Sequence, residues 1–449
     1  MPPKRNQNRS KTKNKRPQAS KEPAVDAMGN CVFPRDIMLC ILTRLPVKSL
    51  LRFKSVCKPW CKLFATPKFM KMHHDQFSDD PRNQTFIIYS LSAYHDHTMS
   101  LLNVECNKMK LKPRNLDHPY PEVLFRMDFV GCCNGLVCMG CPPLGQGIVL
   151  WNPTTKLSKF IRLSRVDFGS PDKVSLGFGY DSERSDFKVV RVVCLGKTKK
   201  GKNMGVGVEV YSANSDSWKT IKVDFQFRVL WTNSDVIVNG NPYWVAKVDE
   251  NESSKNQLGE VLVWFDVTKL VFKIVPLSSL DLKEGAQVPL VDWKGSLGAI
   301  LSNKNMERVE SIDVWVFDDG QKIWTKNHTF GPIEMNVDRF VQCSKNGKKI
   351  VGQFRDGKLF VFDPETGLVK KIVIDEAQSY SFWVCGYSES LAYVKGMQQV
   401  VVKKEEKDED EEEDDMEGAL VDVDGFVNSC MQLRGYYIVN NYPFRGIID

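Results

Sequence analysis

One motif recurs five times along this chain and limits its possible folds more than any other feature. In each copy an apolar strand ends on an aromatic residue, a polar turn follows, and a second strand alternates apolar with polar residues. Such alternation is typical of a strand with one buried face, and the Asn, Asp and Gly of the turns favour tight reversals. The copies are IVLWNPTTKLSKFIRL (148–163), VEVYSANSDSWKTI (208–221), VLVWFDVTKLVFKIV (261–275), IDVWVFDDGQKIWTK (312–326) and KLFVFDPETGLVKKIVI (358–374).

The spacing of the copies indicates how many strands each repeat holds. The aromatic residues before the turns, called here the anchor aromatics, are Trp151, Tyr211, Phe265, Phe317 and Phe362. They lie 60, 54, 52 and 45 residues apart, and a second hairpin pattern precedes each of them. Two hairpins in roughly 50 residues is the size of a kelch-type blade.

We therefore predict a mainly β fold, with a β-propeller-like domain of about six blades over residues 84–401. The repeats account for five blades, and the range from five to seven stays open at this stage. A sixth blade can be assembled from residues 86–104 and 382–394, which come from the two ends of the domain. Pairing of chain ends would remove exposed sheet edges.

A helical period precedes the repeats. Ile37, Ile41 and Leu45 recur at intervals of four, Pro34 stands where a first turn would begin, and Pro46 cannot continue a helix. The pattern continues to residue 67 and predicts a small module of three short helices. A unit of this size is near the limit below which a chain rarely buries its own core, so its apolar face would need a partner.

The run FPRDIMLCILTRLPVKSLLRFKSVCKPWCKLFATPKF (33–69) resembles the F-box of plant F-box proteins. Cys40 departs from the family's usual Glu and Pro59 from a small polar residue, but neither change removes an apolar contact residue. We assign the F-box to residues 31–75. The resemblance implies binding to a Skp-type adaptor and, through it, to cullin. The residues that it implies for adaptor binding are Pro34, Ile37, Ile41, Leu42, Leu45, Pro46, Leu50, Val56 and Trp60.

The repeat region resembles the plant F-box-associated interaction domain. The similarity is carried by GCCNGLVCM (131–139), LWNPTT (150–155), GFGYDSERSDFKVVRV (177–192) and CGYSESLAYV (385–394). Together the two resemblances imply a substrate-recognition subunit of an SCF-type ubiquitin ligase rather than an enzyme. Such a subunit holds a target protein near a ubiquitin-charged enzyme, and proximity raises the effective concentration of the reactants.

Charge is concentrated in two segments that cannot bury a core. Residues 1–30 are basic, residues 402–418 are acidic, and we expect both to be disordered. We assign no structure to residues 419–449. The rest of the chain is too weakly basic to predict a nucleic-acid surface. An alternative function remains, a scaffold or nucleic-acid-associated protein that uses the basic tail.

Cysteines supply the main rival chemistry, a zinc site. Cys132, Cys133, Cys138 and Cys141 could provide four thiolates, but no second metal-binding pair lies at a suitable distance. Cys138 also alternates with Leu136 in a strand pattern, which favours a structural core. We expect no metal, cofactor or catalytic residue, and we interpret the carboxylates beside the turns as turn formers. A propeller enzyme is a third possibility, and it would need a metal or clustered carboxylates.

Compartment and partners follow from the remaining features. Thirteen cysteines without a preceding apolar leader favour reduced thiols, and we expect the nucleus or the cytoplasm, with no membrane contact. Most tryptophans fall at related positions of the repeats and are predicted to be core. Trp231 lies between polar neighbours and is a candidate contact for the target protein.

Overall fold

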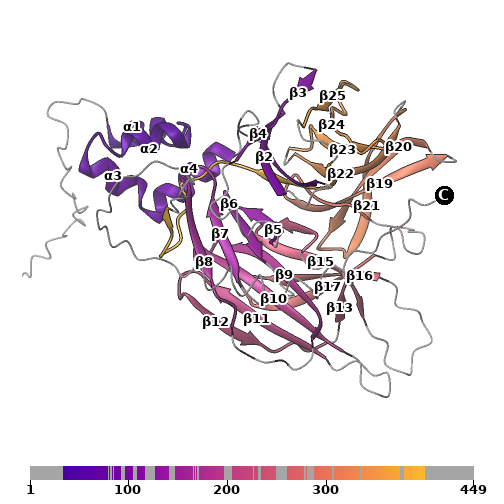
Figure 1. Cartoon of the computed structure of the whole chain (residues 1–449), viewed down its shortest axis with the longest axis horizontal. Coiled ribbons are helices and arrows are strands. Elements are labelled where there is room, and N and C mark those ends of the chain that lie inside the picture. The colour runs from indigo at the N-terminus through magenta and orange to yellow at the C-terminus, as the bar shows by residue number, and fades with distance from the viewer. Residues whose placement is uncertain are drawn as a thin grey trace, which may run out of the picture.

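The computed structural model shows a small helical module beside a ring of β-sheets (Figure 1). The module consists of α1 (Arg35–Leu42), α2 (Val47–Phe53), α3 (Lys58–Phe64) and α4 (Pro67–Ser78). The structure describes residues 34–399 except 79, 81–82, 84, 93–96, 105–108, 117–126, 141–146, 165, 167, 169–170, 197–204, 226, 231–233, 249–259, 278–279, 281–287, 306–307, 334–335, 345 and 375–378. The predicted tails, 1–30 and 402–449, lie outside the described residues.

The described strands form six sheets, numbered here as blades I to VI. Blade I holds β5 (Asp128–Cys133), β6 (Leu136–Gly140), β7 (Ile148–Asn152), β8 (Leu157–Ile161) and β27 (Gln398–Gln399). Blade II holds β9 (Pro171–Asp181), β10 (Asp186–Leu195), β11 (Val206–Ser212) and β12 (Ser217–Ile221). Blade III holds β13 (Phe227–Val229), β14 (Val236–Val238), β15 (Asn241–Val248), β16 (Glu260–Asp266) and β17 (Val271–Pro276).

The other three blades complete the ring. Blade IV holds β18 (Leu290–Trp293), β19 (Ser296–Asn305), β20 (Arg308–Asp318) and β21 (Ile323–Phe330). Blade V holds β22 (Val337–Cys343), β23 (Ile350–Phe354), β24 (Leu359–Phe362), β25 (Val369–Ile372) and β3 (Lys110–Leu111). Blade VI holds β26 (Ser379–Tyr387), β1 (Thr85–Ser92), β2 (His97–Asn103) and β4 (Arg114–Asn115).

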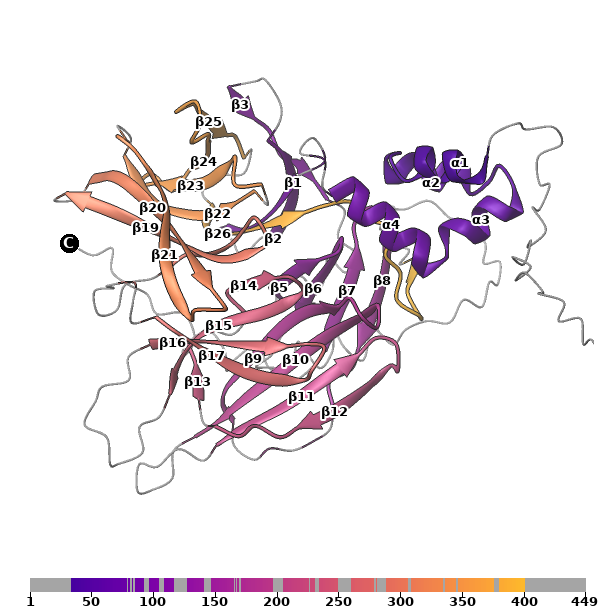
Figure 2. The ribbon, with the colours of Figure 1, turned by 180° about the vertical axis from the view of Figure 1, so that it is seen from behind.

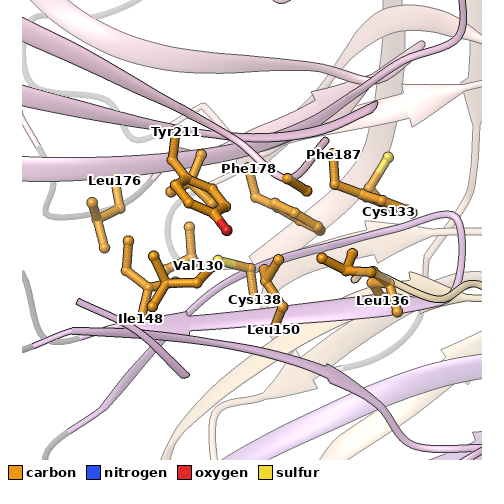
Figure 3. Packing of buried hydrophobic residues seen from close by; sticks show 14 of the residues in the cluster. Val130, Cys133, Leu136, Cys138, Ile148, Leu150, Leu176, Phe178, Phe187 and Tyr211 are labelled. Carbon is orange, nitrogen blue, oxygen red and sulfur yellow. The ribbon is translucent and has the colours of Figure 1, made fainter. Parts of the chain in front are cut away.

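Six apolar clusters hold the blades together, and each cluster draws on two neighbouring sheets. Between blades I and II, for example, Leu150 and Cys138 face Phe178 and Phe187 (Figure 3). The cluster around Tyr89 joins blade VI to blade I, and another joins blade VI to blade V. The ring is therefore closed by packing around its whole circumference, and the prediction of about six blades is confirmed.

Each anchor aromatic is buried as the repeats predict, and the residue after it shapes the turn. In blade I, Asn152 follows Trp151, and its Oδ1 accepts the backbone N–H groups of Thr154 at 3.0 Å and Thr155 at 3.2 Å. Asp266 accepts equivalent bonds in blade III, and Asp318 and Asp363 do so in blades IV and V. These carboxylates are turn formers, as the sequence indicated.

Blade VI joins the two ends of the propeller sequence. Its strand β26 pairs antiparallel with β1, with Cys385 opposite Ile87. The predicted sixth blade is thus confirmed, but the predicted strand over residues 382–394 is wrong in its second half. The strand ends at Tyr387, because the residues that follow leave the sheet and pack Leu391 against the helical module.

The helical module contains the three predicted helices and a fourth, α4, that the sequence did not predict. Pro67 does not end the helical segment but begins α4, since a proline in the first turn costs no backbone hydrogen bond. The apolar face of α4 stacks Phe69, His73 and Phe77, one turn apart. His73 Nε2 lies 2.8 Å from the Leu45 carbonyl oxygen, and burial lowers the pKa of this imidazole.

Candidate protein-interaction surfaces

The first helix presents an apolar stripe to solvent. Pro34 is exposed, and the exposed fractions of Ile37 and Ile41 are 47% and 51%. Spacings of three and four residues place all three on one face of α1. Two isoleucines left in water on a small module are unfavourable unless a partner covers them, since burying each is worth about 1.5–3 kcal/mol. The stripe is therefore a candidate docking surface.

The nine residues expected to bind an adaptor divide into three groups. Pro34, Ile37, Ile41, Pro46 and Val56 are exposed, while Leu45 and Trp60 are half-buried. Leu42 and Leu50 lie in the interior of the module, where they pack with Val47 and Phe64. For these two the prediction of a contact surface is corrected, because a side chain closed in by its own helices offers no area to a partner.

Trp60 has a structural role besides any contact with a partner. Its ring lies 5.5 Å from that of Phe53 and 6.1 Å from that of Phe64, measured between centroids. It therefore links α2 to α3. Truncation of Trp60 would disturb the module itself, so Ile37 and Ile41 are the better positions at which to test the docking surface.

Residues 388–397, called here the strap, join the module to blade I (Figure 2). Leu391 is buried with the module's core residues. The side-chain amide of Asn152 donates to the carbonyl oxygens of Ser390 at 3.1 Å and Ala392 at 2.9 Å. The Ser390 hydroxyl donates to the Asn134 carbonyl oxygen at 2.8 Å. The strap thus connects the module and the propeller through both apolar packing and hydrogen bonds.

Topology gives the propeller two distinct ends. In an antiparallel blade the first and third reversals lie at one end, and the connection between the second and third strands lies at the other. The strap contacts Asn134 and Asn152, which belong to the first and third reversals of blade I. The module therefore sits at the end with the tight turns. The strand ends that lead from β6 to β7, from β10 to β11 and from β15 to β16 lie at the opposite end.

Sequence reasoning missed one exposed aromatic residue of the ring. Trp383 lies on β26, is 39% exposed, and has its ring 5.6 Å from that of Tyr89. It is four residues from Tyr387, whose hydroxyl is 2.8 Å from that of Thr154 at the tight-turn end. Trp383 therefore lies halfway along the strand, between the two ends of the propeller. No local pattern marked it, and Trp231, the candidate predicted instead, lies outside the described residues.

Cysteines of blade I pack as core residues. Cys133 and Cys138 are buried between blades I and II, and burial raises the pKa of the Cys138 thiol (Figure 3). Cys132 points to the other side of β5. There a hydrogen bond with Cys385 and burial both raise the pKa of the Cys132 thiol. Cys141 lies outside the described residues. Among the residues that are described, no group of three or more His, Cys, Asp or Glu could hold a metal ion.

A buried ionic network joins blades II and III. Lys188 Nζ lies 2.6 Å from Asp181 Oδ2 and donates to the Val267 carbonyl oxygen at 2.9 Å. The Thr268 hydroxyl donates to Asp181 Oδ1 at 3.1 Å. Burial opposes ionisation of Asp181, but hydrogen bonds from Lys188 and Arg184 outweigh it and lower its pKa to about 2. The network is satisfied internally, so it reads as structure rather than as a reactive site.

A helical docking module fastened to a six-bladed propeller defines a two-part binding protein. Residues 31–72 match the F-box domain, and residues 84–394 match the F-box associated beta propeller domain. The chain belongs to the family of F-box proteins that carry this propeller. Within the described part of the chain, no helix has the length and apolar character needed to cross a membrane.

Curated relatives come from Arabidopsis thaliana. An F-box protein is 29% identical over 49% of this chain, and the match spans only 55% of that relative's length. An F-box/kelch-repeat protein is 26% identical over 63% of this chain and 70% of its own length. A putative F-box/kelch-repeat protein is also 26% identical, over 67% of this chain and 80% of its own length. A solved oligogalacturonate lyase in complex with manganese is 8% identical over 63% of this chain and 77% of its own, with a TM-score of 0.32. A likeness that low supports no functional argument.

Proposed function

We propose that this protein is the substrate-recognition subunit of an SCF-type ubiquitin ligase. The helical module binds a Skp-type adaptor, and through it cullin, while the propeller holds a target protein. The observation that carries the proposal is the exposed stripe of Pro34, Ile37 and Ile41 on a module that the strap fastens to a large binding scaffold. Membership of the F-box family supports the same assignment.

The mechanism is proximity rather than chemistry on this chain. A target held on the propeller and a ubiquitin-charged enzyme held through cullin meet at a high effective concentration. Such a mechanism needs a defined separation between the two binding surfaces. The strap supplies that here, because Asn152 and Leu391 tie the module to blade I at two separate contacts.

The end of the propeller away from the module is the proposed target surface. A target bound there stays clear of the adaptor, and connecting segments at the ends of strands are where binding residues are most often found. Trp383 is the described residue that we propose as a contact, because exposed aromatic residues contribute strongly to protein interfaces.

Paired substitutions in the module test the proposal. Ile37→Asp with Ile41→Asp should abolish binding of a purified Skp-type adaptor in calorimetry, because each places a charge in the apolar contact. Lys62→Asp on α3, also exposed, is the control and should bind as the unchanged protein does. Target ubiquitination in a reconstituted reaction should fall with the first variant alone. Retained adaptor binding by the Ile37 and Ile41 variant would refute the proposal.

Two earlier expectations stay predictions. The alternative function as a scaffold or nucleic-acid-associated protein depends on residues 1–22, which lie outside the described residues. Steep salt dependence of nucleic-acid binding would favour it. A location in the nucleus or cytoplasm is likewise untested, and microscopy of a fluorescent fusion would test it.

A further inference from the structure

A positively charged cavity lies where the helical module meets blades I and VI. Its volume is about 170 Å³. Lys48 reaches it from α2, Arg114 from β4, and Lys156 from the turn between β7 and β8. Glu389 of the strap is the one carboxylate among its described lining residues, so the cations outnumber it. Concave walls of low dielectric constant concentrate such a field.

The chain itself runs to the rim of this cavity. In blade I, β27 pairs antiparallel with β8, with Gln398 opposite Ser158 and Gln399 opposite Leu157. Gln399 is therefore paired with the residue that follows Lys156 in the sequence. The described chain thus ends beside one of the three cations that line the cavity.

The sequence beyond that point has the opposite charge. Residues 405–417 contain eleven acidic side chains and one lysine. The first of them, Glu405, follows Gln399 by six residues. Six residues can span up to about 20 Å, which is enough to enter a cavity that begins beside the point of exit.

We propose that carboxylates of the acidic segment 405–417 enter this cavity within the same molecule and lie against Lys48, Arg114 and Lys156. A short tether holds the segment at a local concentration in the millimolar range, so weak individual contacts suffice for occupancy. This inference is independent of any ligase activity.

Zero-length cross-linking of the full chain tests the docking. A carbodiimide joins a lysine amine to a carboxylate only where the two are in contact. Mass spectrometry should find Lys48 and Lys156 linked to peptides from 405–417 within monomers. The yield should fall several-fold when ionic strength rises from about 0.1 M to about 1 M, because the Debye length shrinks from about 10 Å to about 3 Å. Lys322 on blade IV, also exposed, is the control amine: it can link to its neighbour Asp319 but should rarely link to peptides from 405–417.

Substitutions at Arg114 sharpen the test, since they leave both amines available. Arg114→Gln should lower the yield at Lys48 and Lys156 several-fold, whereas Arg114→Lys, which keeps the charge, should preserve it. Equal linking of Lys322, or no linking at the cavity at low salt, would overturn the proposal. Links found in dimers, with a yield that rises with protein concentration, would overturn it in favour of the acidic segment of a second copy.

Discussion

At the scale of residues, blades I, III, IV and V each rely on two adjacent residues with opposite roles. The anchor aromatic is buried between sheets, and the Asn or Asp that follows turns back to bind backbone N–H groups of the reversal. One residue supplies apolar area and the next supplies the geometry of the turn. The alternation along a strand places them on opposite faces.

Truncation of an anchor aromatic should be far more costly than a change in the turn. Trp151→Ala empties a large core site and should lower the free energy of unfolding by about 3–5 kcal/mol. Phe362→Ala should lower the free energy of unfolding by a similar amount. Glu365→Ala, at an exposed turn position, should change the free energy of unfolding by no more than about 0.5 kcal/mol. Urea unfolding followed by circular dichroism measures all three, and similar losses at Trp151 and Glu365 would contradict the assigned packing.

Asp181 makes stability depend on acid pH. Its pKa in the folded protein, about 2, lies below the ordinary carboxyl value, so its contribution is full above about pH 4 and is lost as pH falls toward 2. The loss from this buried group should be about 2 kcal/mol. Asp181→Asn should remove this part of the dependence of the free energy of unfolding on pH. Because the variant leaves Lys188 buried without its partner, it should also lower the free energy of unfolding by about 3–5 kcal/mol at neutral pH.

The matched control is Glu183→Gln, an exposed neighbour in the same turn, which should keep the pH dependence. Urea unfolding measured at a series of pH values gives both quantities. An unchanged acid slope in the Asp181 variant would show that the network contributes nothing to stability.

At the scale of elements, the strap is the least regular part of the molecule and has the most varied contacts. It leaves β26, packs Leu391 in the module, accepts hydrogen bonds from Asn152, and returns to blade I as β27. The same segment therefore completes the module's core and covers an outer strand of blade I. Covering an outer strand in this way also hides an unpaired edge.

A charge in the strap should loosen the module without unfolding the ring. Leu391→Asp would bury an unpaired carboxylate among the module's core residues, which is strongly unfavourable. Hydrogen exchange should quicken in α2, α3 and α4, while the amides of blades II to V keep their protection. Tyr393→Asp, two residues further and exposed, is the control and should leave exchange unchanged. Unchanged exchange in the Leu391 variant would mean that the module folds independently of the strap.

At the scale of the whole molecule, the ring is closed by a strand from the far end of the propeller sequence. Blade VI takes β26 from residues 379–387 and β1 from residues 85–92, so its sheet cannot form until nearly the whole domain has been made. Contacts so distant in sequence are slow to form and bind the ends of the domain into one cooperative unit.

Truncations at the two sides of β26 should have opposite results. A chain that ends at residue 378 lacks β26 and the strap, exposes the clusters that join blade VI to its neighbours, and should lose the main thermal transition. A chain without residues 1–28 and 403–417 should keep it, since neither segment has enough apolar residues to contribute to the hydrophobic core. Scanning calorimetry of both truncated chains shows which of them keeps the main thermal transition. A large fall in melting temperature for the second chain would show that a tail packs.

The amino-acid sequence by itself determined which segments are strands, which aromatic residues are buried and where the turns fall, because these depend on local periodicity and turn chemistry. It also marked the helical module and its exposed stripe. Only the tertiary structure decided that Leu42 and Leu50 face inward, that Leu391 completes the module's core, and that Trp383 is exposed on the closing strand. Periodicity shows that a face is apolar, but the element that covers it comes from elsewhere in the chain, and local sequence carries no record of that partner.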